Sequence, residues 1–283
     1  MIVSSDVHSP SLDAAIADGC RPTAPLWAAP GAPAWPDADR ISVSGCLDVT
    51  VPARFHGPAE MGNGGWVAGA VAAMLPGQAA RLAEVTLRAP TPLDVALHCE
   101  WSSYQARLYA PAGGILAEAV PLAAGRTPTA PPFVPLAVAR QAAEGFAGHA
   151  EHPFPTCVVC GPSRAVGDGM RILPGPVAGE PGMVAAPWTV AASLAGADGR
   201  VPTAATWGAL DCPTGWALHT PGAVALLGRL AVAVEADVLA GQTYVVVARK
   251  DGVSGRKAFA HAGLYDLSGA LVAASRATWV TIG

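Results

Sequence analysis

Four residues of types that bind metal ions lie close together in the segment 149–160, HAEHPFPTCVVC. They are His149, His152, Cys157 and Cys160, and cysteine and histidine are preferred ligands of zinc. A zinc site usually needs four suitably placed ligands, and a single C-x-x-C pair with nearby histidines is a less specific pattern than two such pairs. Three interpretations stay open: a metal site, a reversible disulfide, and two buried cysteines in a turn, which we favour.

A second candidate site consists of Asn63, Gly64 and Gly65, which come just before an apolar stretch at 66–82 that we expect to be a buried helix. Free N–H groups and the positive dipole end at a helix start can stabilise a developing oxyanion. Glycine lets a ligand approach the backbone closely. Asn63 is also a preferred N-cap, so the pattern indicates either a catalytic helix start or simply a capped helix.

The composition narrows the class of protein. Apolar residues make up 52% of the 283 residues and charged residues 13%, which is enough apolar material for a large core. The formal charge of −4 provides no basic field, so we expect no nucleic-acid partner. Charged residues interrupt the most apolar stretch, 223–248, and the first residues lack the features of a secretory signal. We therefore expect a cytoplasmic protein without a membrane span.

The chain begins with an arm rich in proline and alanine, and a regular pattern follows it. Residues 1–40 are expected to be irregular, with Trp27 and Trp35 packed on the body, because proline removes a backbone donor. Alternation and β-branched residues then predict a strand at 41–52, ahead of the helix. Short strand-like segments follow the helix at 83–89, 95–103, 106–111 and 115–122.

The same order of elements recurs in the second half of the chain. A strand is expected at 182–190 and a helix within 213–230. Four further strands are expected at 231–238, 243–250, 256–266 and 271–282. The pairs Gly65-Trp66 and Gly215-Trp216 are each expected to open the helix of their half. This repetition predicts an α+β protein made of two similar units.

The segments 55–75 and 85–94, with their repeat at 210–218 and 231–248, resemble the hot-dog superfamily. More narrowly, they are similar to the double hot-dog acyl-CoA thioesterases, known as the TesB-like or thioesterase II family. The resemblance implies a tandem (double) hot-dog fold, in which each unit wraps a curved antiparallel sheet around one central helix.

The predicted domain organisation follows from this resemblance. The irregular arm at 1–40 precedes the first hot-dog unit at 41–122. A connector at 123–181, which contains Cys157 and Cys160, leads to the second unit at 182–283.

The resemblance also implies a pantetheine tunnel beside the central helix, whose first N–H groups polarise the thioester carbonyl. Gly64 and Gly65 suit that position, and the Asn63 amide can orient water or the carbonyl. Trp66 and Trp216 are assigned to substrate binding. A cleft between the two units is expected to hold the substrate.

In the second unit, Asp211 matches the aspartate of the water-activating Asp/Thr(or Ser)/Gln group of the TesB-like enzymes, and a carboxylate can orient water or accept its proton. The hydroxyl partner of the family would fall near Asp251 and its glutamine near Thr278, and neither residue type is retained. Ser254 or Thr278 is the candidate hydroxyl. Asp211 can alternatively cap a helix that opens at Pro213.

Two cations, Arg256 and Lys257, belong to a turn rich in basic residues, GRK, in a predicted hairpin. Cations at a rim can hold the phosphates of coenzyme A, and a solvated turn explains them as well.

The function that the resemblance implies is hydrolysis of an acyl thioester, carried either on coenzyme A or on a carrier protein. It requires no cofactor, because coenzyme A is part of the substrate, and homo-oligomerisation stays open. The missing hydroxyl and glutamine partners favour an alternative, which is a non-hydrolytic acyl- or CoA-binding protein or a member with altered, lyase- or dehydratase-like chemistry.

Overall fold

The structure is a computed structural model that describes residues 45–282. The predicted arm at 1–40, with Trp27 and Trp35, lies outside the described residues, as does the beginning of the strand predicted at 41–52. The first unit contains β1 (Gly45–Val49), the 3₁₀ helix η2 (Ala53–Phe55), α2 (Gly64–Ala72), the 3₁₀ helix η3 (Gly77–Ala80), β2 (Leu82–Leu87), β3 (Leu97–Trp101), β4 (Ala106–Tyr109) and β5 (Ile115–Pro121).

The connector and the second unit complete the chain. The connector contains α3 (Leu136–Glu144), the 3₁₀ helix η4 (Ala147–His149) and β6 (Gly175–Pro176). The second unit contains β7 (Met183–Thr189), the 3₁₀ helix η5 (Ala192–Leu194), α4 (Thr203–Ala217), β8 (Val224–Val234), β9 (Thr243–Ser254), β10 (Lys257–Tyr265) and β11 (Leu271–Ile282).

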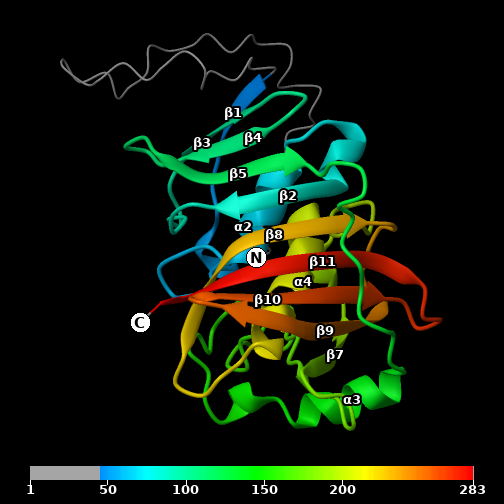
Figure 1. Cartoon of the computed structure of the whole chain (residues 1–283). Coiled ribbons are helices and arrows are strands. Elements are labelled where there is room, and N and C mark those ends of the chain that lie inside the picture. Colours follow the sequence, from blue (N-terminus) through cyan, green and yellow to red (C-terminus); the bar gives the residue numbers. More distant parts are fainter. Residues whose placement is uncertain (1–44, 283) are drawn as a thin grey trace, which may run out of the picture.

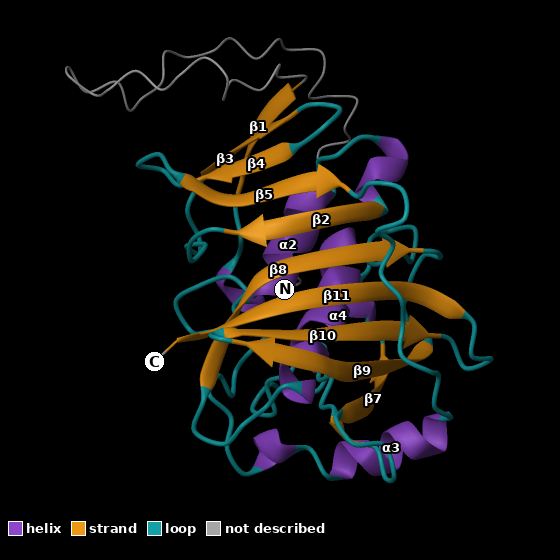
Figure 2. Cartoon of the chain, in the orientation of Figure 1, coloured by secondary structure: helices purple, strands orange, loops and turns teal. Residues whose placement is uncertain are grey.

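All these strands form one continuous antiparallel sheet of eleven strands (Figures 1 and 2). Its order is β1-β3-β4-β5-β2-β8-β11-β10-β9-β7-β6. The first unit therefore has the order 1-3-4-5-2, and the second repeats it as 7-9-10-11-8. The two halves join through the antiparallel pair β2 and β8, in which Val85 lies opposite Leu230. Each unit thus consists of one helix and a five-stranded half-sheet with the same topology.

The helices α2 and α4 lie on the same side of this sheet and pack against each other (Figure 1). Gly65 and Gly69 of α2 allow the close approach, because a Cβ atom at Gly65 would lie 2.3 Å from the Asp211 Cβ and one at Gly69 would lie 2.6 Å from the Ala204 Cα. The first of these contacts involves the later part of α4 and the second its beginning, so the two helices run antiparallel.

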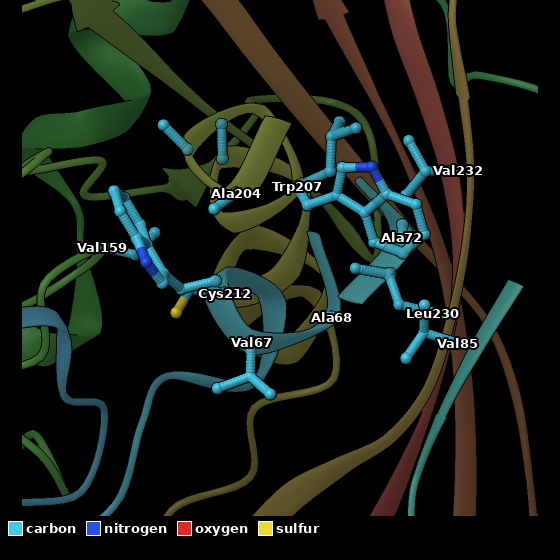
Figure 3. Close-up of a cluster of buried hydrophobic side chains, with 14 of the residues drawn as sticks. Val67, Ala68, Ala72, Val85, Val159, Ala204, Trp207, Cys212, Leu230 and Val232 are labelled. Atoms are coloured by element: carbon cyan, nitrogen blue, oxygen red, sulfur yellow. The ribbon is translucent and has the colours of Figure 1, made fainter. Parts of the chain in front are cut away.

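One large apolar core lies between the two helices and the sheet. Figure 3 shows Ala72 of α2 near Trp207 of α4 and Leu230 of β8, whereas Val67 of α2 lies below Cys212 in this view. Because residues of both units belong to the same cluster, the core is continuous across the junction between them.

A second, smaller core lies under α3 on the opposite face of the sheet. Alternate residues of a strand point to opposite faces, so Val245 and Val247 of β9 reach α3 whereas Val246 and Ala248 face the main core. Burial on both faces explains why β7 and β9 read as nearly continuous apolar runs in the sequence.

The predicted order of strand, helix and four strands is confirmed in both units, but the predicted position of the second helix is wrong. α4 spans Thr203–Ala217 with Pro202 as its N-cap, and Pro213 lies inside it. Gly65 and Trp66 lie at the start of α2, whereas Gly215 and Trp216 lie near the end of α4. The two Gly-Trp pairs are therefore not equivalent.

Burial explains why the sequence pattern misplaced this helix. Most residues of α4 are buried around its whole circumference, so it lacks the amphipathic periodicity that marks a surface helix. As a result, Asp211 lies inside α4 and does not cap a helix. Part of the segment predicted as helix, from Val224 onward, is strand β8. Among residues 45–282, no helix combines the length and the apolar composition that a membrane crossing requires.

Candidate functional site

A cavity of about 440 Å³ lies where the start of α2, the end of α4, strand β8 and the connector meet. Asn63 and Gly64 line it from the first unit, and Asp211 and Trp216 line it from the second. Much of the remaining wall is apolar and includes Met61, Val67, Leu87, Phe154, Leu227 and Trp279. The cavity therefore has largely apolar walls, and its few polar groups come from the start of α2 and from α4.

Asp211 is a buried carboxylate, with 1% of its surface exposed. Its Oδ2 accepts hydrogen bonds from the Gly65 N–H at 2.8 Å and from the Asn63 Nδ2 at 3.1 Å. Its Oδ1 is buried and has no partner among the described residues. Burial raises the pKa of Asp211 to about 7, and the negative charge of Cys157 adds to this, whereas the two hydrogen bonds oppose it. One carboxylate oxygen is thus fixed by two donors, and the other is buried without a partner.

The start of α2 contributes backbone donors to the same place. The Asn63 Oδ1 accepts a hydrogen bond from the Trp66 N–H at 2.9 Å, so Asn63 caps the helix while its amide nitrogen donates to Asp211. The Gly65 N–H is already occupied by the Asp211 carboxylate. Within the described residues, the Gly64 N–H has no hydrogen-bond partner. Gly64 is therefore the helix-start donor that remains available to a ligand in the cavity.

Three buried thiols adjoin the carboxylate. The sulfur atoms of Cys157, Cys160 and Cys212 all lie within 4.8 Å of one another. The Asn63 Nδ2 lies 3.7 Å from the Cys157 Sγ and 3.6 Å from the Cys212 Sγ, so one amide links the thiol cluster to Asp211. Hydrogen bonds from the other two thiols and from backbone N–H groups lower the pKa of Cys157 well below its usual value.

No pattern in the sequence singled out Cys212 as a site residue. It lies far in sequence from the C-x-x-C segment. Because the second helix was predicted to begin after it, nothing placed Cys212 on a helix that faces the cavity. The one local signal was its place directly after Asp211, the carboxylate already selected.

The two histidines of the connector take other positions. The His152 Nε2 lies 3.1 Å from the Cys160 carbonyl oxygen, and its Nδ1 accepts a hydrogen bond from the Phe154 N–H at 2.9 Å. Both ring nitrogens are therefore engaged with backbone, and burial lowers the pKa of His152. His149 packs edge-on against Phe146. Neither histidine belongs to the thiol cluster, although His152 lines the cavity beside Trp216.

The remaining candidate residues lie apart from Asp211. Ser254, Arg256 and Lys257 are exposed at the β9–β10 turn, and none of them lines the cavity. Thr278 is half-buried in β11, opposite Phe259 of β10, and does not line the cavity either. Lys250 of β9 is a cation that does line it.

Of the two tryptophans assigned to substrate binding, one lines the cavity and the other does not. Trp66 is buried and stacks on Phe55 with ring centroids 3.9 Å apart, away from the cavity wall. Trp216 lines the cavity. The structure therefore brings together Asn63, Gly65 and Asp211, with Gly64 and Trp216 at the same cavity.

Comparison with solved structures finds proteins of similar architecture. A proposed thioesterase from Novosphingobium aromaticivorans aligns with a TM-score of 0.55 and 14% identity over 84% of this chain and 96% of its own. A proposed thioesterase II from Thermobifida fusca aligns with a TM-score of 0.53 and 15% identity over 84% and 92% of the two chains. A hot-dog protein of unknown function from Alicyclobacillus acidocaldarius aligns with a TM-score of 0.52 and 14% identity over 84% of this chain and 93% of its own.

No protein-family model matches the sequence, and a comparison with curated proteins gives no match either. At these identities the structural likeness concerns the fold, and it extends over most of each chain compared. The repeated half-sheet topology, the two central helices and this likeness together show that the chain has a double hot-dog fold.

Proposed function

We propose that this chain hydrolyses acyl thioesters in the cavity between its two units. The single observation that carries the proposal is the Asp211 carboxylate, which is buried at the cavity with Oδ2 held by two donors and Oδ1 without a partner. A carboxylate fixed in this way can orient a water molecule and accept its proton. Structural relatives described as thioesterases support the same class of reaction.

The other groups at the cavity have complementary roles in this proposal. Asp211 takes a proton from water as the water oxygen bonds to the thioester carbonyl carbon, and the developing oxyanion accepts a hydrogen bond from the Gly64 N–H. The carbon–sulfur bond then breaks, and the proton passes from Asp211 to the leaving sulfur, which gives the free acid and thiol. Asn63 is a positioning residue, because it holds both the helix start and the carboxylate. The apolar walls suit an acyl chain.

The cations near the cavity are proposed to bind the phosphates of coenzyme A. Lys250 lines the cavity, and Arg256 and Lys257 follow in the adjacent turn, where an exposed ammonium or guanidinium can pair with phosphate. In this proposal coenzyme A is part of the substrate, and the protein works in the cytoplasm without a required cofactor.

The test is a panel of acyl-CoA substrates of increasing chain length, assayed by release of free thiol from the full chain. Asp211→Asn keeps an acceptor for the Gly65 N–H and is expected to lower kcat by at least about 100-fold, because general-base catalysis contributes about 10²–10⁴-fold. Glu144→Gln, which neutralises an exposed carboxylate on α3, is the matched control and is expected to leave the rate unchanged. Absence of thiol release at every chain length would contradict hydrolysis, whereas an undiminished rate in Asp211→Asn would contradict only the role of Asp211.

One observation favours a second candidate function, which is binding of an acyl-CoA without hydrolysis. The Asp211 carboxylate contacts the Asn63 amide and no hydroxyl or glutamine side chain among the described residues, so the water-activating group expected from the family resemblance is incomplete. Calorimetric binding of a non-hydrolysable acyl-CoA analogue, together with no thiol release, is the result that would favour this candidate.

A further inference from the structure

The segment Cys157-Val158-Val159-Cys160-Gly161 forms a tight turn that brings two cysteines together. The Gly161 N–H donates to the Cys157 carbonyl at 2.9 Å and closes this turn. A Cβ atom at Gly161 would lie 2.5 Å from the Cys157 carbonyl oxygen and 2.6 Å from its nitrogen, so the turn requires glycine. The backbone of this turn therefore holds Cys157 and Cys160 in a compact arrangement.

A third sulfur from a distant part of the chain completes a cluster with this turn. Cys212 projects from α4, and its Sγ lies 3.8 Å from the Cys157 Sγ. Two sulfurs that each lie about 2.3 Å from a tetrahedral zinc ion are separated by about 3.8 Å, whereas a disulfide requires about 2.05 Å. The spacing of Cys157 and Cys212 therefore fits shared coordination of one ion, and the Cys160 sulfur lies within 4.8 Å of both.

A side-chain donor also faces the cluster. The Asn63 Nδ2 lies 3.7 Å from the Cys157 Sγ and 3.6 Å from the Cys212 Sγ. Several thiolates buried together without a cation would repel one another strongly, and a bound divalent ion removes that cost.

We propose that Cys157, Cys160 and Cys212 bind one zinc ion through three thiolates, with the fourth coordination position open to the cavity. Soft thiolate ligands favour zinc among the common divalent ions of cells. All three cysteines line the cavity, so a water molecule or another small oxygen or sulfur ligand can reach the fourth position. His152 is not a ligand, because both of its ring nitrogens are engaged with backbone. The cluster adjoins Asp211 in the same cavity, but the zinc proposal does not rest on the proposed hydrolysis.

The test is elemental analysis of the full chain, purified without a histidine tag and without chelators, after dialysis with zinc and a reductant. One zinc per chain is expected for the natural sequence. Cys212→Ser is expected to retain less than about a tenth of that zinc after gel filtration. Cys99→Ser removes a buried free thiol of β3 that lies outside the cluster, and it is the matched control expected to retain the metal.

A second measurement on the natural chain does not depend on the folding of any variant. Cobalt(II) in place of zinc is expected to produce sulfur-to-cobalt charge-transfer absorption and the visible bands of a tetrahedral site. The proposal is overturned if the reduced chain takes up neither metal, or if Cys212→Ser binds zinc as the natural chain does. It is also overturned if a disulfide joins two of these cysteines in chain isolated without oxidant. None of these readouts uses thiol release, so failure of the hydrolysis assay leaves them valid.

Discussion

The two units share one strand topology, but their helices contribute different chemistry to the cavity. α2 has nine residues without a charged side chain, and it offers backbone N–H groups and a capping amide at its start. α4 has fifteen residues and presents a carboxylate and a thiol from its interior. Because each helix holds only part of the polar groups, the site exists only where the two units meet.

The asymmetry also explains how the two helices are held together. The Asp211 carboxylate of α4 accepts the Gly65 N–H of α2, so the carboxylate serves as an acceptor for the other helix as well as a candidate catalytic group. A negative group at the positive end of a helix dipole is favourable. The proposed catalysis and the packing of the two units therefore involve the same contact, and this can be tested by breaking it.

The largest effect is expected from Gly65→Ala. A Cβ atom there would lie 2.3 Å from the Asp211 Cβ and 2.9 Å from the Trp207 carbonyl oxygen, so the helices must move apart. We expect the free energy of unfolding, measured by urea denaturation, to fall by about 3 kcal/mol.

Gly252→Ala is the matched control, because a Cβ atom at Gly252 has nothing within 4 Å. Equal stability of the two variants would show that α2 and α4 do not need their close approach.

A smaller effect is expected from Asn63→Ala. This change removes the acceptor of the Trp66 N–H and a donor to the buried Asp211 carboxylate, and we expect a loss of about 2 kcal/mol in urea denaturation. Because Asn63 holds the carboxylate, thiol release is expected to fall as well, by about tenfold.

Ser102→Ala is the control for Asn63→Ala, since Ser102 also accepts backbone N–H groups in the first unit but lies away from the cavity. It is expected to lower stability while leaving the rate intact. If both variants retained the full rate, Asn63 would be a structural cap and nothing more.

The smallest effect is expected from Arg229→Ala at the β2–β8 junction. The Arg229 Nη1 lies 3.5 Å from the Glu84 Oε1, and the Arg229 side chain is about half exposed, so solvent screens the pair. We expect a loss below about 1 kcal/mol.

A double-mutant cycle with Glu84→Gln isolates the contribution of this pair. A coupling energy well above about 1 kcal/mol would mean that charges, in addition to the backbone ladder and the continuous core, hold the two units together.

The strands and the first helix could be predicted from the sequence because their signals are local. Alternation in the segment that became β3 and β-branched runs such as that of β9 depend on neighbouring residues alone. The start of α2 is likewise marked by Asn63 and two glycines. The second helix was misplaced because burial on all sides removes its periodicity and because Pro213, a typical helix-opening residue, lies inside it.

The sequence by itself determined the fold class, the repeated order of elements and the candidates Asn63, Gly64, Gly65 and Asp211. Only the tertiary structure decided that the second helix carries Asp211 in its interior, that this carboxylate accepts the Gly65 N–H, and that Cys212 joins Cys157 and Cys160. The physical reason is that these contacts join residues far apart in the chain. Their geometry follows from the antiparallel packing of α2 against α4. Small residues permit this close packing, but no local sequence pattern specifies it.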